Sequence, residues 1–252
     1  MSECGKILWI VSPFSVIIGV GVVIGLGWSF LGLQEARVRK AVDEALGILF
    51  GCLVCSRLFY VAVHGFYYRS HLIEIPQVWL GGLSGVGGIW GALLAWWLIS
   101  AISRRSPAFP VDRLVYLGSG IAIAVWAACW FGGCAYGPNA NGAWWGVMAR
   151  DEWGTFAPRF PTQLLGILII LALVWILDRL PSRRRKLAPG ILAALGLAGL
   201  SLELFVLSFF RGDPSLSWLG LRLDAWGALS LLLVSLVIIF WLSRPHKAPH
   251  SR

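Results

Sequence analysis

The sequence predicts an all-α, polytopic membrane protein with seven transmembrane helices. Of its 252 residues, 58% are hydrophobic and only 13% are charged, and the mean hydropathy is +0.77. So few polar side chains cannot cover the surface of a water-soluble globule. The apolar residues also gather in seven stretches, each close to the roughly 20 residues that a helix needs to cross the hydrocarbon core of a membrane.

The seven predicted spans follow one another closely, so we expect a single transmembrane domain over residues 1–252. They cover residues 12–33, 44–64, 78–102, 114–134, 161–178, 188–210 and 225–243. The third span carries a glycine at nearly every second position between 81 and 91, which favours close helix packing or a ligand against the backbone. The connection 138–160 carries Trp144, Trp145 and Trp153, which suit an interfacial aromatic belt.

Basic residues predict the orientation of the spans. Fourteen Lys and Arg residues fall in the connections on one side, and six fall on the other. Because cytoplasmic loops of membrane proteins are enriched in Lys and Arg, we expect the N-terminus outside and the C-terminus in the cytoplasm. The net charge of +9 then lies on the cytoplasmic face, beside anionic lipid headgroups. Nucleic acid is therefore not expected as a partner.

Two charged residues fall inside the apolar spans. Arg57 lies in the second span and Glu203 in the sixth, at similar depths below the same face if each residue rises about 1.5 Å. Because an unpaired charge inside a membrane is costly, we expect the two side chains to meet. A structural ion pair that fixes the two helices is favoured over a catalytic role.

Cysteine and histidine do not form a metal-binding pattern. Cys52 and Cys55 have the C-x-x-C spacing but lie in the middle of the second span, where small packing residues are expected. Cys129 and Cys134 end the fourth span and are also expected to be packing residues. The histidines are not at metal-ligand spacing, so neither a metal site nor a cofactor is predicted.

Six segments occur in the order of a known family of membrane proteins. They are 13–16 (PFSV), 56–61 (SRLFYV), 79–91 (WLGGLSGVGGIWG), 136–147 (YGPNANGAWWGV), 158–164 (PRFPTQL) and 209–214 (FFRGDP). Together they resemble the prolipoprotein diacylglyceryl transferases. The resemblance implies seven spans in the bacterial plasma (inner) membrane and an N-terminus outside. It also implies transfer of diacylglycerol from phosphatidylglycerol to the thiol of a lipobox cysteine in a prolipoprotein.

The same resemblance, together with the charges, suggests substrate-binding residues. These are Arg57, Gly87, Gly88, Tyr136, Gly137, Arg159, Gln163 and Arg211. For Arg159, Gln163 and Arg211, simple anchoring at the outer interface is an equally good interpretation. For the two glycines, tight helix packing is the alternative. The implied partners are a membrane phospholipid, phosphatidylglycerol, and a prolipoprotein.

Several positions depart from the family pattern. Val86 stands where the family has a histidine, Trp126 where it has its signature arginine, and Leu204 where it has a further arginine. Other polar positions of the family fall on Gly19, Cys129, Cys134 and Ser208. We expect Val86, Trp126 and Leu204 to lie roughly two to three turns below the outer face. None of the three side chains can bind a phosphate or deprotonate a thiol.

Three functions stay open at this point. In the first, the chain performs the family reaction, with Arg57, Arg159 or Arg211 holding the phosphate and His64 acting as the base. Alternatively, it is a noncatalytic paralogue that binds a phospholipid or an acylated partner in an apolar cavity lined by the three replaced positions. The third is a different membrane function on the same scaffold, such as lipid transfer. The residues favour the noncatalytic interpretation, because function follows the site more closely than the fold.

Overall fold

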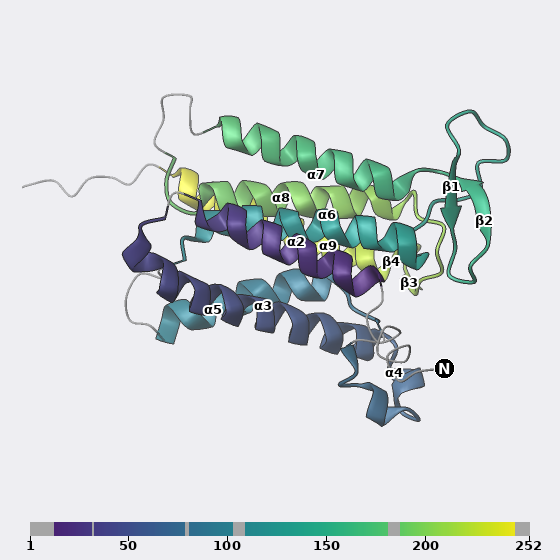
Figure 1. Cartoon of the computed structure of the whole chain (residues 1–252), viewed down its shortest axis with the longest axis horizontal. Coiled ribbons are helices and arrows are strands. Elements are labelled where there is room, and N and C mark those ends of the chain that lie inside the picture. The colour runs from purple at the N-terminus through teal and green to yellow at the C-terminus, as the bar shows by residue number, and fades with distance from the viewer. Residues whose placement is uncertain (1–12, 32, 79–80, 103–108, 181–186, 245–252) are drawn as a thin grey trace, which may run out of the picture.

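Seven long helices lie side by side in the protein (Figure 1). The computed structural model describes residues 13–31, 33–78, 81–102, 109–180 and 187–244. The helices are α2 (Pro13–Phe30), α3 (Glu35–Val63), α5 (Gly85–Ile102), α6 (Leu114–Gly132), α7 (Thr162–Arg179), α8 (Ile191–Ser208) and α9 (Leu223–Ser243). Within the described residues, these seven are long and apolar enough to cross a membrane. The predicted fold class, an all-α polytopic membrane protein, is confirmed.

Short elements gather at one end of the bundle (Figure 1). They are α4 (Gly65–Tyr68), η1 (Leu72–Glu74), β1 (Val147–Arg150), β2 (Phe156–Arg159), β3 (Ser217–Trp218) and β4 (Leu221–Arg222). β1 and β2 pair antiparallel with Val147 opposite Arg159, and β3 and β4 pair with Ser217 opposite Arg222. We call this end the hairpin end. It carries the connections α3–α5, α6–α7 and α8–α9, whereas η3 (Val111–Arg113) precedes α6 at the opposite end.

Two predicted helix starts are wrong. The second span was expected from residue 44, but α3 begins at Glu35, because a charged first part continues the helix beyond the apolar stretch. The third span was expected from residue 78, but α5 begins at Gly85. Gly81 and Gly82 have φ values of +88° and +71°, a left-handed conformation that ordinary helix geometry excludes. The glycine-rich segment is therefore partly a loop and partly a helix.

Glycines bring pairs of helices into close contact. A Cβ on Gly91 of α5 would lie 2.4 Å from the carbonyl oxygen of Gly51 in α3. A Cβ on Gly120 of α6 would lie 2.8 Å from the Cα of Gly25 in α2. Small residues at such contacts are typical of membrane bundles, where close van der Waals packing replaces hydrophobic association.

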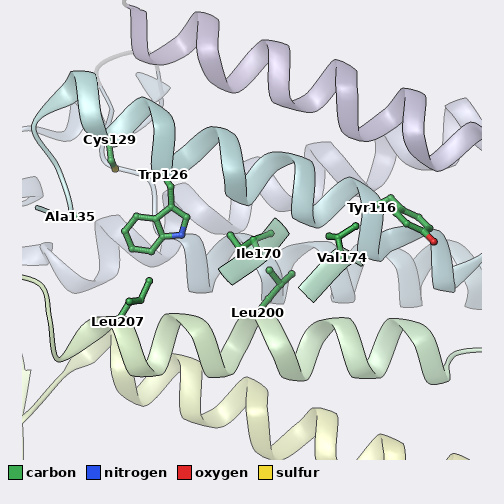
Figure 2. Close-up of a cluster of buried hydrophobic side chains, with 8 residues drawn as sticks. All are labelled: Tyr116, Trp126, Cys129, Ala135, Ile170, Val174, Leu200 and Leu207. Atoms are coloured by element: carbon green, nitrogen blue, oxygen red, sulfur yellow. The ribbon is translucent and has the colours of Figure 1, made fainter. Parts of the chain in front are cut away.

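Two clusters of buried apolar side chains tie these pairs together. The first cluster joins α6, α7 and α8, and Figure 2 shows Trp126 between Cys129 and Ile170 with Leu207 of α8 close by. The second lies toward the end opposite the hairpins and includes Ala45 and Ile48 of α3, Leu117 of α6 and the preceding Phe109. The α3–α5 pair is thus joined to the rest of the bundle at that opposite end.

Replacing Gly91 with Ala is expected to destabilise the protein by about 1–3 kcal/mol, because the added methyl group collides with the α3 backbone. Gly27→Ala in α2 is the matched control, since a Cβ there meets no atom within 4 Å. Both changes gain about 1 kcal/mol of helix propensity, so their difference isolates the collision. Thermal unfolding of the purified variants in detergent measures this difference in stability. Equal unfolding midpoints for the two variants would contradict the close packing of α5 on α3.

Candidate functional site

Arg57 is buried near the hairpin end of α3, with 5% of its surface exposed. Its guanidinium lies 5.3 Å from the centre of the Tyr68 ring. It donates hydrogen bonds to four backbone carbonyl oxygens, those of Glu74 (2.6 Å), Ile75 (2.8 Å), Gly81 (2.6 Å) and Gly82 (3.0 Å). The neighbouring Ser56 hydroxyl donates to the Ser84 carbonyl (2.8 Å). Together these contacts hold residues 74–75 and 81–84 against α3.

The expected ion pair between Arg57 and Glu203 is not formed. Glu203 of α8 is 3% exposed, its polar neighbour is the Trp126 side chain, and its Oε1 has no hydrogen-bond partner among the described residues. Arg57 instead extends its long side chain toward the end of its helix, as basic residues near the ends of membrane spans commonly do. Carbonyl groups from a folded-back loop, which the sequence does not reveal, replace the carboxylate as its partners.

A pocket of about 390 Å³ opens beside Arg57 at the hairpin end. Its lining residues are Arg57, Tyr60, His64, Tyr67, Tyr68, Glu74, Gly81 and Gly82. The Arg57 guanidinium has five N–H groups. Four of these groups donate to carbonyl oxygens, which leaves one N–H group for a ligand. Because those acceptors are uncharged, the positive charge of Arg57 is not cancelled by them. We call this cavity the Arg57 pocket.

His64 lies in the same pocket at the end of α3. Its Nδ1 is 3.0 Å from the Tyr60 carbonyl oxygen, and the two rings stack with centres 4.1 Å apart. With Nδ1–H donating to that carbonyl, Nε2 is the nitrogen left to accept a proton. The pocket therefore brings together Arg57 and His64, which the first of the three open functions uses as phosphate ligand and base.

Glu74 supplies the carboxylate of the Arg57 pocket. The Tyr67 hydroxyl donates to Glu74 Oε2 (2.9 Å), and the Tyr67 ring stacks on His71 with centres 4.3 Å apart. The hydrogen bond to Glu74, with smaller effects from desolvation and from the Glu74 charge, raises the pKa of Tyr67. One carboxylate oxygen of Glu74 is thus occupied by Tyr67.

Arg159 belongs to a second group of residues at the hairpin end. Its guanidinium stacks 4.5 Å from the centre of the Tyr136 ring, and its Nη2 lies 2.9 Å from Asp151 Oδ2. The other oxygen of Asp151 accepts hydrogen bonds from the backbone N–H groups of Trp153 (3.1 Å) and Thr155 (2.7 Å). This buried ion pair fixes the turn between β1 and β2.

Arg211 is also held by carboxylates. Its Nε donates to Asp213 Oδ1 (2.9 Å), and its Nη1 lies 3.5 Å from Asp224 Oδ2. Arg222 lies 3.3 Å from the same Asp213. Burial by itself would lower the pKa of Arg211, but the hydrogen bonds and charge of Asp213, with a contribution from Asp224, raise it. Arg159 and Arg211 are therefore less free to bind a phosphate than Arg57.

Gln163 and Gly137 hold the chain around these arginines. Gln163 is fully buried and donates through Nε2 to the Cys134 carbonyl (3.0 Å), while its Oε1 has no hydrogen-bond partner in the part of the chain that the structure describes. A Cβ on Gly137 would lie 2.4 Å from the Phe160 carbonyl oxygen. Gly212, next to Arg211, donates its N–H to the Tyr136 carbonyl (2.7 Å). The structure thus brings Tyr136, Gly137, Arg159, Gln163 and Arg211 to one region.

Gly87 and Gly88 lie at the contact between α5 and α3, as the packing interpretation expects. A Cβ on Gly87 would lie 2.5 Å from the Phe59 Cβ, and one on Gly88 would lie 3.1 Å from the Cys52 sulfur. Cys52 is correspondingly a free, half-buried cysteine. These two glycines are not among the residues that line the Arg57 pocket.

Cys129 and Cys134 form a disulfide, so the expectation of two packing residues was wrong. Their Cα atoms lie 4.6 Å apart, because Gly133, with φ of +69°, ends α6 and turns the chain back. Two cysteines that flank a Gly-Gly pair at a helix end were the available signal in the sequence.

The replaced family positions are filled by packed apolar side chains. Val86, 4% exposed, fits against Gly227 of α9, where a Cβ would lie 2.5 Å from Val86 Cγ1. Trp126, 5% exposed, covers Gly166 of α7, where a Cβ would lie 2.4 Å from the indole ring. Leu204 packs against the same cluster as Trp126.

The expected common site of these three residues holds only in part, and their depth below the outer face stays a prediction. Val86 is the second residue of α5 and belongs to the α5–α9 contact, because α5 begins only at Gly85. Trp126 and Leu204 do come together, in the cluster of α6, α7 and α8.

The fold and the Arg57 pocket define a multi-pass α-helical membrane protein with a polar pocket at one end of its helices. Comparison with known proteins identifies its family. The sequence profile of the prolipoprotein diacylglyceryl transferases matches residues 6–241, and the chain belongs to this family.

Relatives with the same name align along most of the chain. The phosphatidylglycerol–prolipoprotein diacylglyceryl transferase of Streptococcus sanguinis is 29% identical over 94% of this chain and 93% of its own length. The protein of that name from Paramagnetospirillum magneticum is 30% identical over 87% of this chain and 85% of its own. The one from Geobacillus kaustophilus is 44% identical, but over only 32% of this chain and 30% of its own.

Replacing Asp151 with Asn is expected to destabilise the protein by about 3 kcal/mol, because it leaves the buried Arg159 without its carboxylate. The neighbouring exposed residue supplies the matched control: Glu152→Gln should change stability by no more than about 0.5 kcal/mol. Unfolding in detergent, followed by tryptophan fluorescence, compares the two. An unchanged midpoint in Asp151→Asn would show that the ion pair is dispensable.

Proposed function

We propose that this protein is a noncatalytic member of its family that binds a membrane phospholipid, with the headgroup in the Arg57 pocket. The observation that carries this proposal is the packing of Val86 and Trp126 against the glycine backbones of α9 and α7. The positions where the resemblance expects a histidine and an arginine hold buried apolar side chains. Acid–base chemistry and phosphate binding both require polar groups, so neither function can be performed from these positions.

The Arg57 pocket supports the lipid-binding part of the proposal. Arg57 keeps its charge among carbonyl groups and has one N–H group free, which suits a phosphate oxygen. Arg159 and Arg211 are engaged by Asp151 and Asp213. The relatives' name makes phosphatidylglycerol the first phospholipid to examine. An acylated protein is the other partner that the noncatalytic interpretation allows.

Transfer of diacylglycerol to a thiol is the second candidate function. One observation favours it: Arg57 and His64 line the same pocket. In this scheme His64 Nε2 takes the proton from a cysteine thiol, and the thiolate attacks the terminal glycerol carbon of the lipid. The bond between that carbon of the diacylglycerol unit and the phosphate oxygen breaks. Glycerol phosphate leaves as an anion, which Arg57 stabilises.

Complementation of a bacterial strain depleted of its own diacylglyceryl transferase separates the two candidates. We expect correct membrane expression, phospholipid that copurifies with the protein, and no gel shift of a reporter prolipoprotein. A gel shift that is lost in His64→Ala but kept in His71→Ala would instead establish the transferase. His71 is the control because it stacks on Tyr67 without lining the pocket. Purification without bound phospholipid would contradict the lipid-binding proposal.

We also propose that the hairpin end faces the outside of the bacterial inner membrane. The charge distribution supports this orientation, because fourteen Lys and Arg residues of the sequence fall on the opposite side and six on the side of the hairpin end. The Cys129–Cys134 disulfide is a second, independent support, since disulfides persist mainly in oxidising compartments outside the cytosol.

Reporter fusions test this orientation. Alkaline phosphatase, which is active only outside the cytoplasm, should be active when joined after Gly142 and inactive when joined to the C-terminus. A fluorescent protein that folds in the cytoplasm should give the reverse result. Active phosphatase at the C-terminus, with equal expression of the two fusions, would reverse the proposed orientation.

A further inference from the structure

We infer that the Arg57 pocket selects a headgroup that carries both a phosphate and an ammonium group, as phosphatidylethanolamine does. This inference rests on the proposed function, because it assumes that a phospholipid headgroup enters the pocket. It goes further by naming the chemistry of the preferred headgroup.

The charges of the lining residues are the first argument. Among the described residues, the lining contains one arginine, Arg57, and one carboxylate, Glu74, whose formal charges cancel. A ligand of zero net charge then leaves the pocket neutral. An anionic headgroup such as phosphoglycerol adds an unbalanced negative charge beside Glu74, and like charges at short range oppose binding.

The Arg57 side of the pocket suits the phosphate. Four carbonyl groups and the Tyr68 ring fix the plane of the guanidinium, so little conformational entropy is lost when a ligand binds to its remaining N–H group. This remaining N–H group belongs to Nη2, whose other N–H donates to the Glu74 carbonyl oxygen.

The Glu74 side suits the ammonium group. Its Oε2 accepts the Tyr67 hydroxyl, and Oε1 has acceptor capacity left for a charged N–H donor. Tyr60, Tyr67 and Tyr68 place aromatic rings around the same pocket. The electron-rich faces of tyrosine rings attract organic cations, and the effect grows as water is excluded.

Binding of short-chain lipids to the purified wild-type protein tests this preference. Isothermal titration in detergent, with dihexanoyl phosphatidylethanolamine and dihexanoyl phosphatidylglycerol as probes, should give about tenfold tighter binding of the ethanolamine lipid, because one charge-assisted hydrogen bond is added. Equal or tighter binding of the glycerol lipid would overturn the inference but leave the proposed function intact. No binding of either lipid would overturn both.

A charge-neutral variant tests the role of Glu74. Glu74→Gln keeps the backbone carbonyl that binds Arg57 and an oxygen that can accept the Tyr67 hydroxyl. We expect this variant to lose the tenfold preference by binding the ethanolamine lipid more weakly. Glu152→Gln removes a carboxylate outside the pocket and should keep the preference. A preference that survives in Glu74→Gln would overturn the inference.

The same chemistry also exists in a soluble molecule, glycerophosphoethanolamine, which lacks the acyl chains. Weak binding of this compound relative to the dihexanoyl lipid would identify a membrane lipid as the source of the headgroup. Equally tight binding would support the same recognition by Arg57 and Glu74 with a soluble ligand.

Discussion

The hydrogen bonds from Arg57 to four carbonyl groups are the interaction on which the hairpin end of α3 and α5 depends. They hold residues 74–75 and 81–82 against α3, and they do so with a charge that would be costly inside the membrane without partners. The left-handed Gly81 and Gly82 present two of these carbonyls, and α5 begins only after them. The same hydrogen bonds from Arg57 to the carbonyls of Gly81 and Gly82 therefore set where α5 begins and form one wall of the Arg57 pocket.

Close helix contacts impose a second constraint, and they act in two different ways. In the α3–α5 and α2–α6 pairs, glycines allow the backbones themselves to approach. At Gly166 and Gly227, glycines instead provide space for large side chains, Trp126 and Val86, from neighbouring helices. The second arrangement fills the region where the family resemblance places polar groups. Membership in the family is thus compatible with a changed site, because a fold can persist while the side chains that perform chemistry are replaced.

The arginines at the hairpin end differ in what neutralises them. Arg159 and Arg211 have carboxylate partners, and those ion pairs shape the β1–β2 turn and the start of α9. Arg57 is bonded to neutral carbonyls. A carboxylate partner neutralises most of the positive charge with which an arginine would attract an anion. An arginine bonded to uncharged carbonyl groups still attracts an anion with its full charge. This difference makes the Arg57 pocket the best-supported ligand site.

The sequence by itself determined the class of the protein, the number of spans, the family and most of the helix bounds. These follow from apolar length and from local motifs, which are properties of neighbouring residues. The tertiary structure alone decided which polar groups meet. It paired Arg57 with loop carbonyls in place of Glu203, joined Cys129 to Cys134, and engaged Arg159 and Arg211 with aspartates. These partners depend on loops that turn at glycines with positive φ and on side chains that reach between helices. Hydropathy along one chain does not show which side chains such loops bring together.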